Sequence, residues 1–308
     1  IGVEFESGRY EWFTNKKIII SIDGIEWKRD KWSFLAKLYL WWAEKLAVKY
    51  SHFDISDNES IQDYTAIRYE TLSKVIEYGA DHTMNVMPTN DDYVKYTFLK
   101  EDYAVKVCRI EPENNVEMVL EAFGTIQNIN LVLVGNWNNS EYGKALKIKF
   151  NSYKNIFLFD PIYNQREIDL IRGNATIYVH GHSAGGTNPS LVEAMHLGLP
   201  IIAFKVSYNR TTTENKALYF SDTSNLIELL LKTNASKFAT ISQNMKTIAN
   251  RRYTWEIVAK KYSQLFNQAL ALQTKSSIYN EINTIDQEYL EKIQLAHLKY
   301  TNLFYEKR

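Results

Sequence analysis

A glycine-containing turn between a predicted strand and a predicted helix is the segment best suited to chemistry. It runs from His182 to Met195 with the sequence HSAGGTNPSLVEAM. Gly185 and Gly186 allow the backbone to approach a ligand closely. Asn188 is a good helix N-cap, and Pro189 suits the first helical position. Free N–H groups at the positive end of such a helix would bind an anion. The turn therefore predicts a phosphate cradle, while an ordinary strand-to-helix turn would explain the same residues.

A second candidate segment, residues 107–115 with the sequence VCRIEPENN, follows another predicted strand. Because the carboxyl ends of parallel strands share one edge of a sheet, Arg109 is expected near the glycine turn. Its guanidinium could bind a diphosphate through paired hydrogen bonds. Glu193, on the helix after the turn, could contact the same ligand. The alternatives are a solvated ion pair of Arg109 with Glu111 or Glu113, and a helix carboxylate that faces water.

The elements that must position these residues follow an alternating strand–helix pattern. The first part of the chain has predicted strands at 17–23, 52–56 and 74–78 and helices at 31–50 and 59–69. The second part has predicted strands at 103–109, 130–135, 155–159, 175–180 and 200–204 and helices at 116–124, 142–151, 165–173 and 189–197. This alternation predicts α/β domains with parallel, doubly wound sheets.

Loss of periodicity between residues 80 and 101, together with Pro88 and several Asn and Asp residues, indicates a linker. We therefore expect an N-terminal domain at 1–97, a C-terminal domain at 98–272 and a helical tail at 273–308. The N-terminal domain is predicted to be incomplete, because no glycine-rich strand-to-helix loop precedes its first strand.

Composition excludes several classes of protein. The 308 residues carry 36 Lys+Arg and 36 Asp+Glu, so no basic surplus attracts nucleic acid, and no P-loop is present. No apolar run reaches the roughly 20 residues of a membrane span. The single cysteine, Cys108, excludes an internal disulfide and a thiolate metal cluster, and the 6 His are scattered. We expect no metal ion, no cofactor and a cytoplasmic location, with no secretory signal at the start of the given sequence.

Taken together, the two chemistry-bearing segments resemble the retaining nucleotide-sugar glycosyltransferases of family 4, which have the GT-B architecture of two Rossmann-like domains. In that family an Arg follows the first strand of the C-terminal domain in a pattern that ends in Lys-Gly. Arg109 matches this Arg, but Asn114 and Asn115 stand where the Lys and Gly would be. The family's two glutamates, eight positions apart, fall on Gly185 and Glu193. The ribose-binding glutamate is thus present, and the donor-sugar glutamate is absent.

Within the family, the sequence looks most similar to the rhamnosyltransferase-like enzymes of bacterial polysaccharide assembly. The matching segments are 23–33, 109–115 and 185–190, with the sequences DGIEWKRDKWS, RIEPENN and GGTNPS. The resemblance implies a hexosyltransferase that moves a sugar from a dTDP- or UDP-linked donor, most simply dTDP-rhamnose, to a lipid-diphosphate-linked saccharide. Such an enzyme would work at the inner face of the cell membrane.

The resemblance also implies roles for individual residues. Arg109 and the turn would stabilise the charge that develops on the departing diphosphate. Asp23 stands where the family commonly has a His, and it could bind a sugar hydroxyl, accept the acceptor's proton, or only cap the turn at Gly24. The predicted catalytic residues are Asp23, Arg109 and Glu193. The predicted donor-binding residues are Arg109, Asn114, His182, Gly185, Gly186, Thr187, Asn188, Ser190, Glu193 and Arg210, with Glu214 beside them. The predicted acceptor-side residues are Glu26, Trp27, Lys28 and Arg29.

The segment from Trp27 to Tyr50 interleaves basic and aromatic residues. On one helix this pattern suits the headgroup layer of a membrane. A helix with a buried Trp face and a solvated Lys face explains the same pattern.

Two further functions remain open at this point. The missing lysine and glutamate, and the incomplete first domain, suit a domain that binds a nucleotide sugar or a partner protein without turnover. A sugar-nucleotide epimerase with the same architecture would need no saccharide acceptor.

Overall fold

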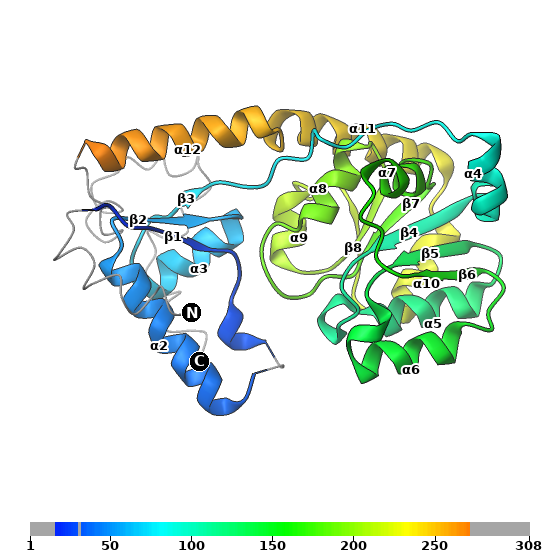
Figure 1. Ribbon diagram of the computed structural model, residues 1–308, viewed down its shortest axis with the longest axis horizontal. Helices are drawn as coiled ribbons and strands as arrows, with labels where there is room; N and C mark the ends of the chain where they lie inside the picture. Colours follow the sequence, from blue (N-terminus) through cyan, green and yellow to red (C-terminus); the bar gives the residue numbers. More distant parts are fainter. Residues whose placement is uncertain (1–15, 30–31, 272–308) are drawn as a thin grey trace. The chain divides into compact units, whose positions relative to one another are not determined.

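The computed structural model describes residues 16–29 and 32–271 (Figure 1). The described residues divide into two compact units: unit 1 comprises residues 16–29, 32–77 and 259–271, and unit 2 comprises residues 78–258. Both units have the predicted α/β fold with parallel strands. The chain leaves unit 1 after Glu77 and returns to it after Val258. The predicted tail at 273–308 lies outside the described residues.

Unit 2 contains a six-stranded parallel sheet in the order β6-β5-β4-β7-β8-β9. The strands are β4 (Tyr103–Val107), β5 (Asn130–Val134), β6 (Ile156–Phe159), β7 (Ile177–His180), β8 (Ile201–Phe204) and β9 (Leu218–Phe220). The first five confirm the predicted strands, whereas β9 was not predicted. The strand order reverses between β4 and β7, and this switch point is where doubly wound sheets bind ligands.

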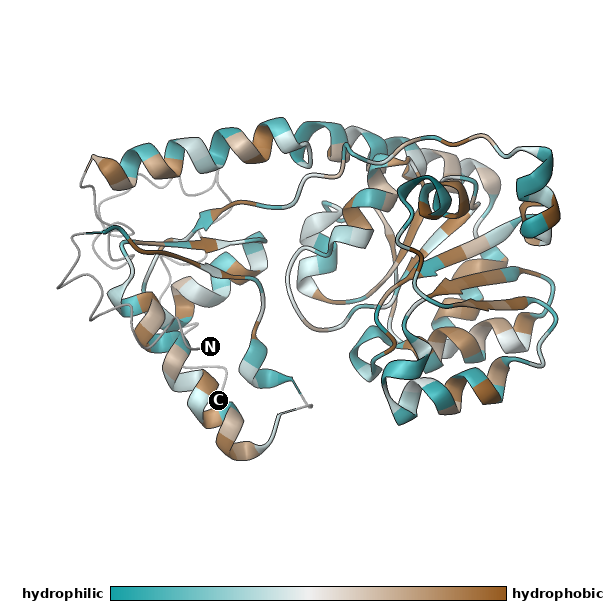
Figure 2. Ribbon diagram, viewed as in Figure 1, coloured by the Kyte–Doolittle hydropathy of each residue, from teal (hydrophilic) through white to brown (hydrophobic). Residues whose placement is uncertain are grey.

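Helices cover both faces of the unit 2 sheet. One face packs against α5 (Val116–Ile126), α6 (Glu141–Phe150) and α10 (Thr223–Lys232). The other packs against α7 (Gln165–Gly173), α8 (Pro189–His196) and α11 (Ala235–Arg252). Successive residues of β4 point to opposite faces of the sheet. Ala104 lies in the core with α5, α6 and α10, and Val105 lies in the core with α7, α8 and α11. Figure 2 shows these strands as mainly hydrophobic ribbons between the helices.

Residues 78–102 belong to unit 2, although their sequence shows no regular hydrophobic period. They contain α4 (Asn90–Lys95) and a 3₁₀ turn at Thr97–Lys100. A capping box of Thr89 and Asp92 starts α4. Arg166 on α7 donates to the same Asp92 at 2.7 Å. Phe98 is a buried core residue. These contacts explain why unit 2 begins at residue 78 and not after the expected domain limit of 97. The end of unit 2 at residue 258 also differs from the expected limit of 272.

Unit 1 contains a three-stranded parallel sheet in the order β1-β2-β3. The strands are β1 (Ile19–Ile22), β2 (Phe53–Ser56) and β3 (Lys74–Val75), and the connecting helices are α2 (Phe34–Tyr50) and α3 (Glu59–Tyr69). Ser33 caps α2 by accepting from the Ala36 N–H. The helix α12 (Trp255–Leu270) starts in unit 2 and continues into unit 1. All three predicted strands of this part are confirmed.

Among the described residues, none of the helices is both long and apolar enough to cross a membrane.

Candidate active site

A cavity of 430 Å³ opens at the carboxyl edge of the unit 2 sheet. Its walls come from the ends of β4 and β5, the loop after β6 and the N-terminus of α8. The lining residues are Val107, Cys108, Arg109, Asn114, Val134, Gly135, Asn136, Pro161, Ile162, Tyr163, His182, Asn188, Pro189, Ser190 and Glu193. Since β4 and α8 lie on either side of the strand-order reversal, the cavity occupies the switch point.

Six of the predicted site residues line this cavity: Arg109, Asn114, His182, Asn188, Ser190 and Glu193. They come from segments up to 84 positions apart in the sequence, between Arg109 and Glu193. The convergence follows from topology, because each segment leaves a strand at the same edge. Gly185, Gly186 and Thr187 belong to the turn before α8 but do not line the cavity.

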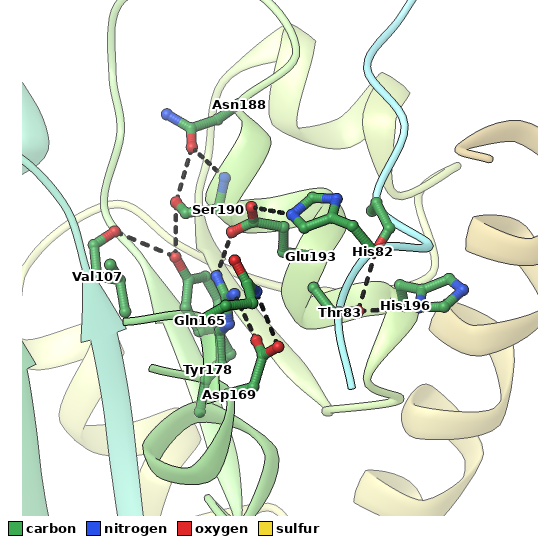
Figure 3. A network of polar contacts seen from close by, with 12 residues as sticks. His82, Thr83, Val107, Gln165, Asp169, Tyr178, Asn188, Ser190, Glu193 and His196 are labelled. Atoms are coloured by element: carbon green, nitrogen blue, oxygen red, sulfur yellow. Dashed lines mark hydrogen bonds and ion pairs between the residues drawn. The ribbon is translucent and has the colours of Figure 1, made fainter. Parts of the chain in front are cut away.

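The N-terminus of α8 is held in a fixed orientation (Figure 3). Asn188 Oδ1 accepts from the backbone N–H of Ser190 at 3.0 Å and from its hydroxyl at 2.7 Å. The Tyr178 hydroxyl, on β7, donates to Ser190 Oγ at 2.8 Å. Burial raises the pKa of that Tyr178 hydroxyl, so it stays a donor. The predicted N-cap is confirmed, and its bonds place the first turn of α8 at the cavity wall.

The turn before α8 needs glycine at its centre. Gly185 has a φ of 129°, a conformation that side chains rarely adopt. The family resemblance would place a glutamate at this position, and in this backbone such a residue would be strained. Gly186 and Thr187 are buried, so the turn is packed rather than open.

Arg109 is about half exposed and close to Glu111, with 3.6 Å between Nη1 and Oε1. The predicted pairing of these two side chains is therefore present. The Arg109 backbone carbonyl accepts from Asn114 Nδ2 at 2.8 Å. The Oδ1 of Asn114 accepts from His182 Nδ1 at 2.7 Å. Asn114 and His182 are both almost completely buried, so this bond fixes the two loops that flank the cavity.

Glu193 is 20% exposed, and both of its oxygens have partners, an ion pair with Arg172 and a hydrogen bond with His82. Its Oε2 accepts from Arg172 Nη1, and its Oε1 lies 3.1 Å from His82 Nε2. Arg172 is in turn anchored by buried Asp169 at 3.1 Å. Sequence reasoning identified Glu193 but missed Arg172 and His82. Figure 3 shows His82 approaching α8 from a segment far away in the sequence.

A buried lysine lies beneath the loops of the cavity. Lys106 on β4 is 1% exposed. Burial lowers its pKa. On β7, burial and the neighbouring His182 and Lys106 hold the pKa of His180 well below its usual value. A Cβ on Gly181 would lie 2.3 Å from the Asn114 carbonyl oxygen and 2.7 Å from Lys106 Nζ. Glycine at 181 therefore lets the loop after β7 lie against Asn114.

The sequence did not identify the residues that the β5 and β6 edges contribute. Gly135 follows β5, and a Cβ there would lie 2.4 Å from the Cys108 carbonyl oxygen. Asn136 Oδ1 accepts from the Ile110 N–H at 3.0 Å. Tyr163 is 93% exposed at the rim. The rule that strand ends share an edge would have found Gly135 and Asn136, since Gly135 ends a predicted strand and Asn136 directly follows it.

Arg210 and Glu214 do not line the cavity. Arg210 lies on the short helix α9 (Ser207–Thr212), where its guanidinium stacks 4.3 Å from the Tyr219 ring and donates to Asn215. Glu214 pairs with Arg252 at 3.2 Å. These contacts hold the α9 region against β9 and α11.

The predicted acceptor-side residues all lie in unit 1. Asp23 is exposed directly after β1. Glu26, Trp27 and Lys28 form a 3₁₀ turn, and Arg29 pairs with Glu26 at 2.9 Å. Trp27 donates from Nε1 to the Tyr64 hydroxyl at 2.8 Å. Trp27 is thus tied to α3.

A buried carboxylate organises this part of unit 1. Glu44 of α2, 8% exposed, accepts from the hydroxyls of Tyr64 and Tyr69. Burial, together with Glu44, raises the pKa of both tyrosines. Arg68 stacks over the Trp27 and Trp41 rings at 4.8 and 4.9 Å.

The opposite face of α2 carries large exposed hydrophobic side chains. They are Phe34, Leu35, Leu38, Tyr39, Trp41 and Trp42, between 37% and 79% exposed. The alternative of a buried Trp face does not hold for Trp41 and Trp42, because the buried face consists of Ala43, Glu44, Ala47 and Val48. Figure 2 shows the hydrophobic positions along α2.

Within residues 16–29 and 32–271, no group of three His, Cys, Asp or Glu side chains is arranged to hold a metal ion.

Residues 91–235, which contain this cavity, match the family model of glycosyl transferases group 1. This segment is therefore similar to glycosyl transferases group 1. Residues 12–81 match a second model, a domain of unknown function called DUF1972. No curated protein matches the sequence.

The fold is the GT-B fold of known glycosyltransferase structures. A sucrose-phosphate synthase from Thermosynechococcus elongatus is 17% identical with a TM-score of 0.71, over 87% of this chain and 72% of that one. The pneumococcal O-GlcNAc transferase GtfA, in complex with UDP and GlcNAc, is 15% identical with a TM-score of 0.56, over 82% and 53%. A variant of TarM from S. aureus, in complex with fondaparinux, alpha-GlcNAc-glycerol and UDP, is 13% identical with a TM-score of 0.59, over 82% and 51%. The chain spans about half the length of the last two proteins.

Proposed function

We propose that this chain transfers a sugar from a nucleoside-diphosphate donor to a saccharide acceptor, with unit 2 binding the nucleotide. The observation that carries the proposal is the cavity at the switch point. Exposed Arg109, the capped N-terminus of α8 and the Glu193 carboxylate line this one cavity, within the segment that matches glycosyl transferases group 1. UDP in the solved complexes of GtfA and TarM supports a nucleoside diphosphate as the ligand.

The residue types suit glycosyl transfer. The bond between the sugar's anomeric carbon and the diphosphate oxygen breaks, and an acceptor hydroxyl bonds to that carbon and loses its proton. Negative charge then develops on the departing diphosphate, while the sugar resembles an oxocarbenium ion. Arg109 and the positive end of the α8 dipole would stabilise that charge without a metal ion. Glu193 would accept hydrogen bonds from the ribose hydroxyls.

The finer assignment rests on the resemblance of the sequence to rhamnosyltransferase-like enzymes. We propose dTDP-rhamnose as the donor, retention of configuration, and a lipid-diphosphate-linked saccharide of a surface polysaccharide as the acceptor. Asp23 and the Glu26–Arg29 turn would serve the acceptor. The exposed aromatic face of α2, which also carries Lys45 and Lys49, supports a peripheral contact with an anionic membrane.

A second candidate is a domain that binds the nucleotide sugar without turnover. The observation that favours it is Gly185, whose φ of 129° excludes an unstrained acidic residue from the position of the donor-sugar glutamate. The two functions predict the same nucleotide binding and differ only in transfer. Transfer of labelled sugar to a lipid-linked acceptor would exclude the non-catalytic function.

The first test is a thermal-shift panel of dTDP, UDP, GDP and their sugar conjugates, because a ligand of the native state raises its melting temperature. We expect a selective shift with one base. Glu193→Gln should weaken that binding at least several-fold, since hydrogen bonds to a charged group contribute about 1.5–3 kcal/mol. Unchanged affinity in this variant would remove Glu193 from the site, and no shift with any nucleotide would contradict the proposed function.

A further inference from the structure

The two places where the chain passes between the units are joined to each other within unit 2. The Ala80 N–H donates to the Tyr253 carbonyl at 2.8 Å. The Trp255 N–H donates to the Asp81 carboxylate at 2.8 Å. A Cβ on Gly79 would lie 2.5 Å from the Trp255 ring, so this ring packs directly on the backbone at Gly79. We call residues 78–84 and 253–258 the crossing segments, because the chain enters unit 2 at 78 and leaves it after 258.

His82 connects these crossing segments to the cavity. Its Nδ1 accepts from Trp255 Nε1 at 3.3 Å, and its Nε2 lies 3.1 Å from Glu193 Oε1. Because an indole N–H only donates, Nδ1 must be unprotonated in this arrangement. A neutral imidazole then carries its proton on Nε2, so His82 donates to the Glu193 carboxylate. One ring thus links Trp255, next to the second passage, with a carboxylate that lines the cavity.

Further bonds fasten the first crossing segment to α7 and α8. The Met84 N–H donates to Asp169 Oδ2 at 3.0 Å, and Asp169 Oδ1 binds Arg172 at 3.1 Å. Thr83 Oγ1 lies 3.0 Å from His196 Nδ1. Arg172 therefore fixes one oxygen of Glu193. His82 fixes the other oxygen from the first crossing segment (Figure 3).

We propose that His82 is a positioning residue, which orients the Glu193 carboxylate for the nucleotide and couples nucleotide binding to the stability of the two crossing segments. The proposal rests on the proposed function, in which Glu193 accepts from the ribose. A carboxylate oxygen can accept two hydrogen bonds, so Oε1 can hold the His82 N–H and a ribose hydroxyl together. A nucleotide that binds the oriented Glu193 carboxylate more tightly stabilises the bonds of His82 to Glu193 and Trp255. By linkage, these bonds strengthen nucleotide binding to the same extent.

Three variants separate this role from a merely structural one. His82→Ala removes both bonds. His82→Gln keeps the polarity of both, because the amide nitrogen can donate to Glu193 and the amide oxygen can accept from Trp255. Trp255→Phe keeps the ring packing and removes only the indole donor. A structural role would not predict recovery by glutamine.

The experiment is amide hydrogen exchange of the crossing segments in the full chain, with and without saturating UDP or dTDP, combined with calorimetric titration of the same nucleotides. In the wild type, nucleotide should slow exchange in residues 78–84 and 253–258. In His82→Ala, exchange should be faster without nucleotide and should no longer respond to it, and nucleotide affinity should fall roughly three- to tenfold, the effect of one net hydrogen bond. His82→Gln should restore both the response of exchange to nucleotide and the nucleotide affinity. Trp255→Phe should give values between those of the wild type and His82→Ala.

The outcomes that oppose the proposal are distinct from failure of the proposed function. If nucleotide binds the wild type but exchange in the crossing segments does not change, the coupling is overturned alone. The same holds if His82→Ala responds to nucleotide as the wild type does, or if glutamine fails to restore affinity. If none of dTDP, UDP and GDP binds the wild type, the proposed function fails and the role of His82 fails with it.

Discussion

The side chains that line the cavity differ in whether they are exposed enough to contact a ligand. Asn114 and His182 are buried against each other, so they hold loops. Arg109 is about half exposed, and Glu193 reaches the cavity from a salt bridge. The sequence predicted all four as donor-binding residues, Arg109 because its strand ends at this edge of the sheet. It placed Arg210 there as well, but that side chain stacks on Tyr219, and no local pattern signals such a contact.

Arg109 lines the cavity and Arg210 does not, so their substitutions should affect nucleotide binding differently. Arg109→Ala should weaken nucleoside-diphosphate binding by about 1.5–3 kcal/mol, because a charge-assisted hydrogen bond is lost. Arg109→Lys should recover only part of this, since an ammonium lacks the forked geometry. Arg210→Ala is the control, because Arg210 lies outside the cavity. Isothermal titration of all three variants checks the order, and equal losses at both positions would contradict it.

A second prediction concerns the turn before α8. Gly185→Ala should destabilise the native state by about 1–3 kcal/mol, because alanine at a φ of 129° is strained. Nucleotide affinity should fall too if the turn reshapes the N-terminus of α8. Urea unfolding and titration of the variant give the two values. Wild-type stability in this variant would mean that the turn has another backbone conformation.

At the scale of elements, the hydrophobic period predicted most strands and helices. It missed β9, whose three residues are too few for a period, and α4, which depends on a capping box and on Arg166. It also missed His82, which reaches Glu193 across 111 positions of sequence. The spacing of residues along the sequence does not indicate that His82 contacts Glu193. The meeting of strand ends can be predicted, because parallel strands end at the same edge of a sheet.

A third prediction concerns the buried lysine of β4. Burial lowers the pKa of Lys106 in the folded chain. The Lys106 amine therefore binds its proton more tightly in the unfolded chain than in the folded one. Its contribution to stability therefore rises with pH between its lowered pKa in the folded chain and about 10.4, the pKa of an unperturbed lysine. Lys106→Met should stabilise unit 2 near pH 7, and this advantage should shrink as the pH rises towards 10, by at most about 1.4 kcal/mol per pH unit.

Urea unfolding of wild type and Lys106→Met at several pH values between 7 and 10 measures this trend. The same substitution at exposed Lys154 serves as the control. An advantage that stays constant with pH would show that Lys106 is protonated in the folded protein.

The exposed face of α2 gives a fourth prediction. Replacing Phe34, Leu35 and Leu38 by Ser should reduce sedimentation of the protein with anionic vesicles, because apolar area and basic residues both contribute to interfacial binding. Ile148→Ser, an 81% exposed hydrophobic residue on α6, is the matched control. Equal binding by all variants would exclude α2 as the membrane contact.

For the whole molecule, the division into two units predicts selective stabilisation. The proposed nucleotide contacts all lie in unit 2, so ligand at 100 times its Kd should add about 2.7 kcal/mol to the stability of that unit alone. Differential scanning calorimetry should show one transition moving upward while the other stays in place. Equal shifts of both transitions would mean that the two units unfold together.

The sequence could not reveal that unit 1 is built from two separated stretches, because each stretch is locally an ordinary α/β or helical pattern. In the structure, Lys261 of α12 pairs with buried Glu77 beside β3. That pairing joins the two stretches of unit 1, and no spacing rule connects residues so far apart.

The order of the stretches bears on how the protein is made. A ribosome completes residues 78–258 before it adds Ala259 and the remainder of α12. The six-stranded sheet and both hydrophobic cores of unit 2 consist of residues between 78 and 258. Unit 2 can therefore fold while unit 1 still lacks the second half of α12. The second domain in sequence is therefore expected to fold first, which reverses the usual order of synthesis from the N-terminus.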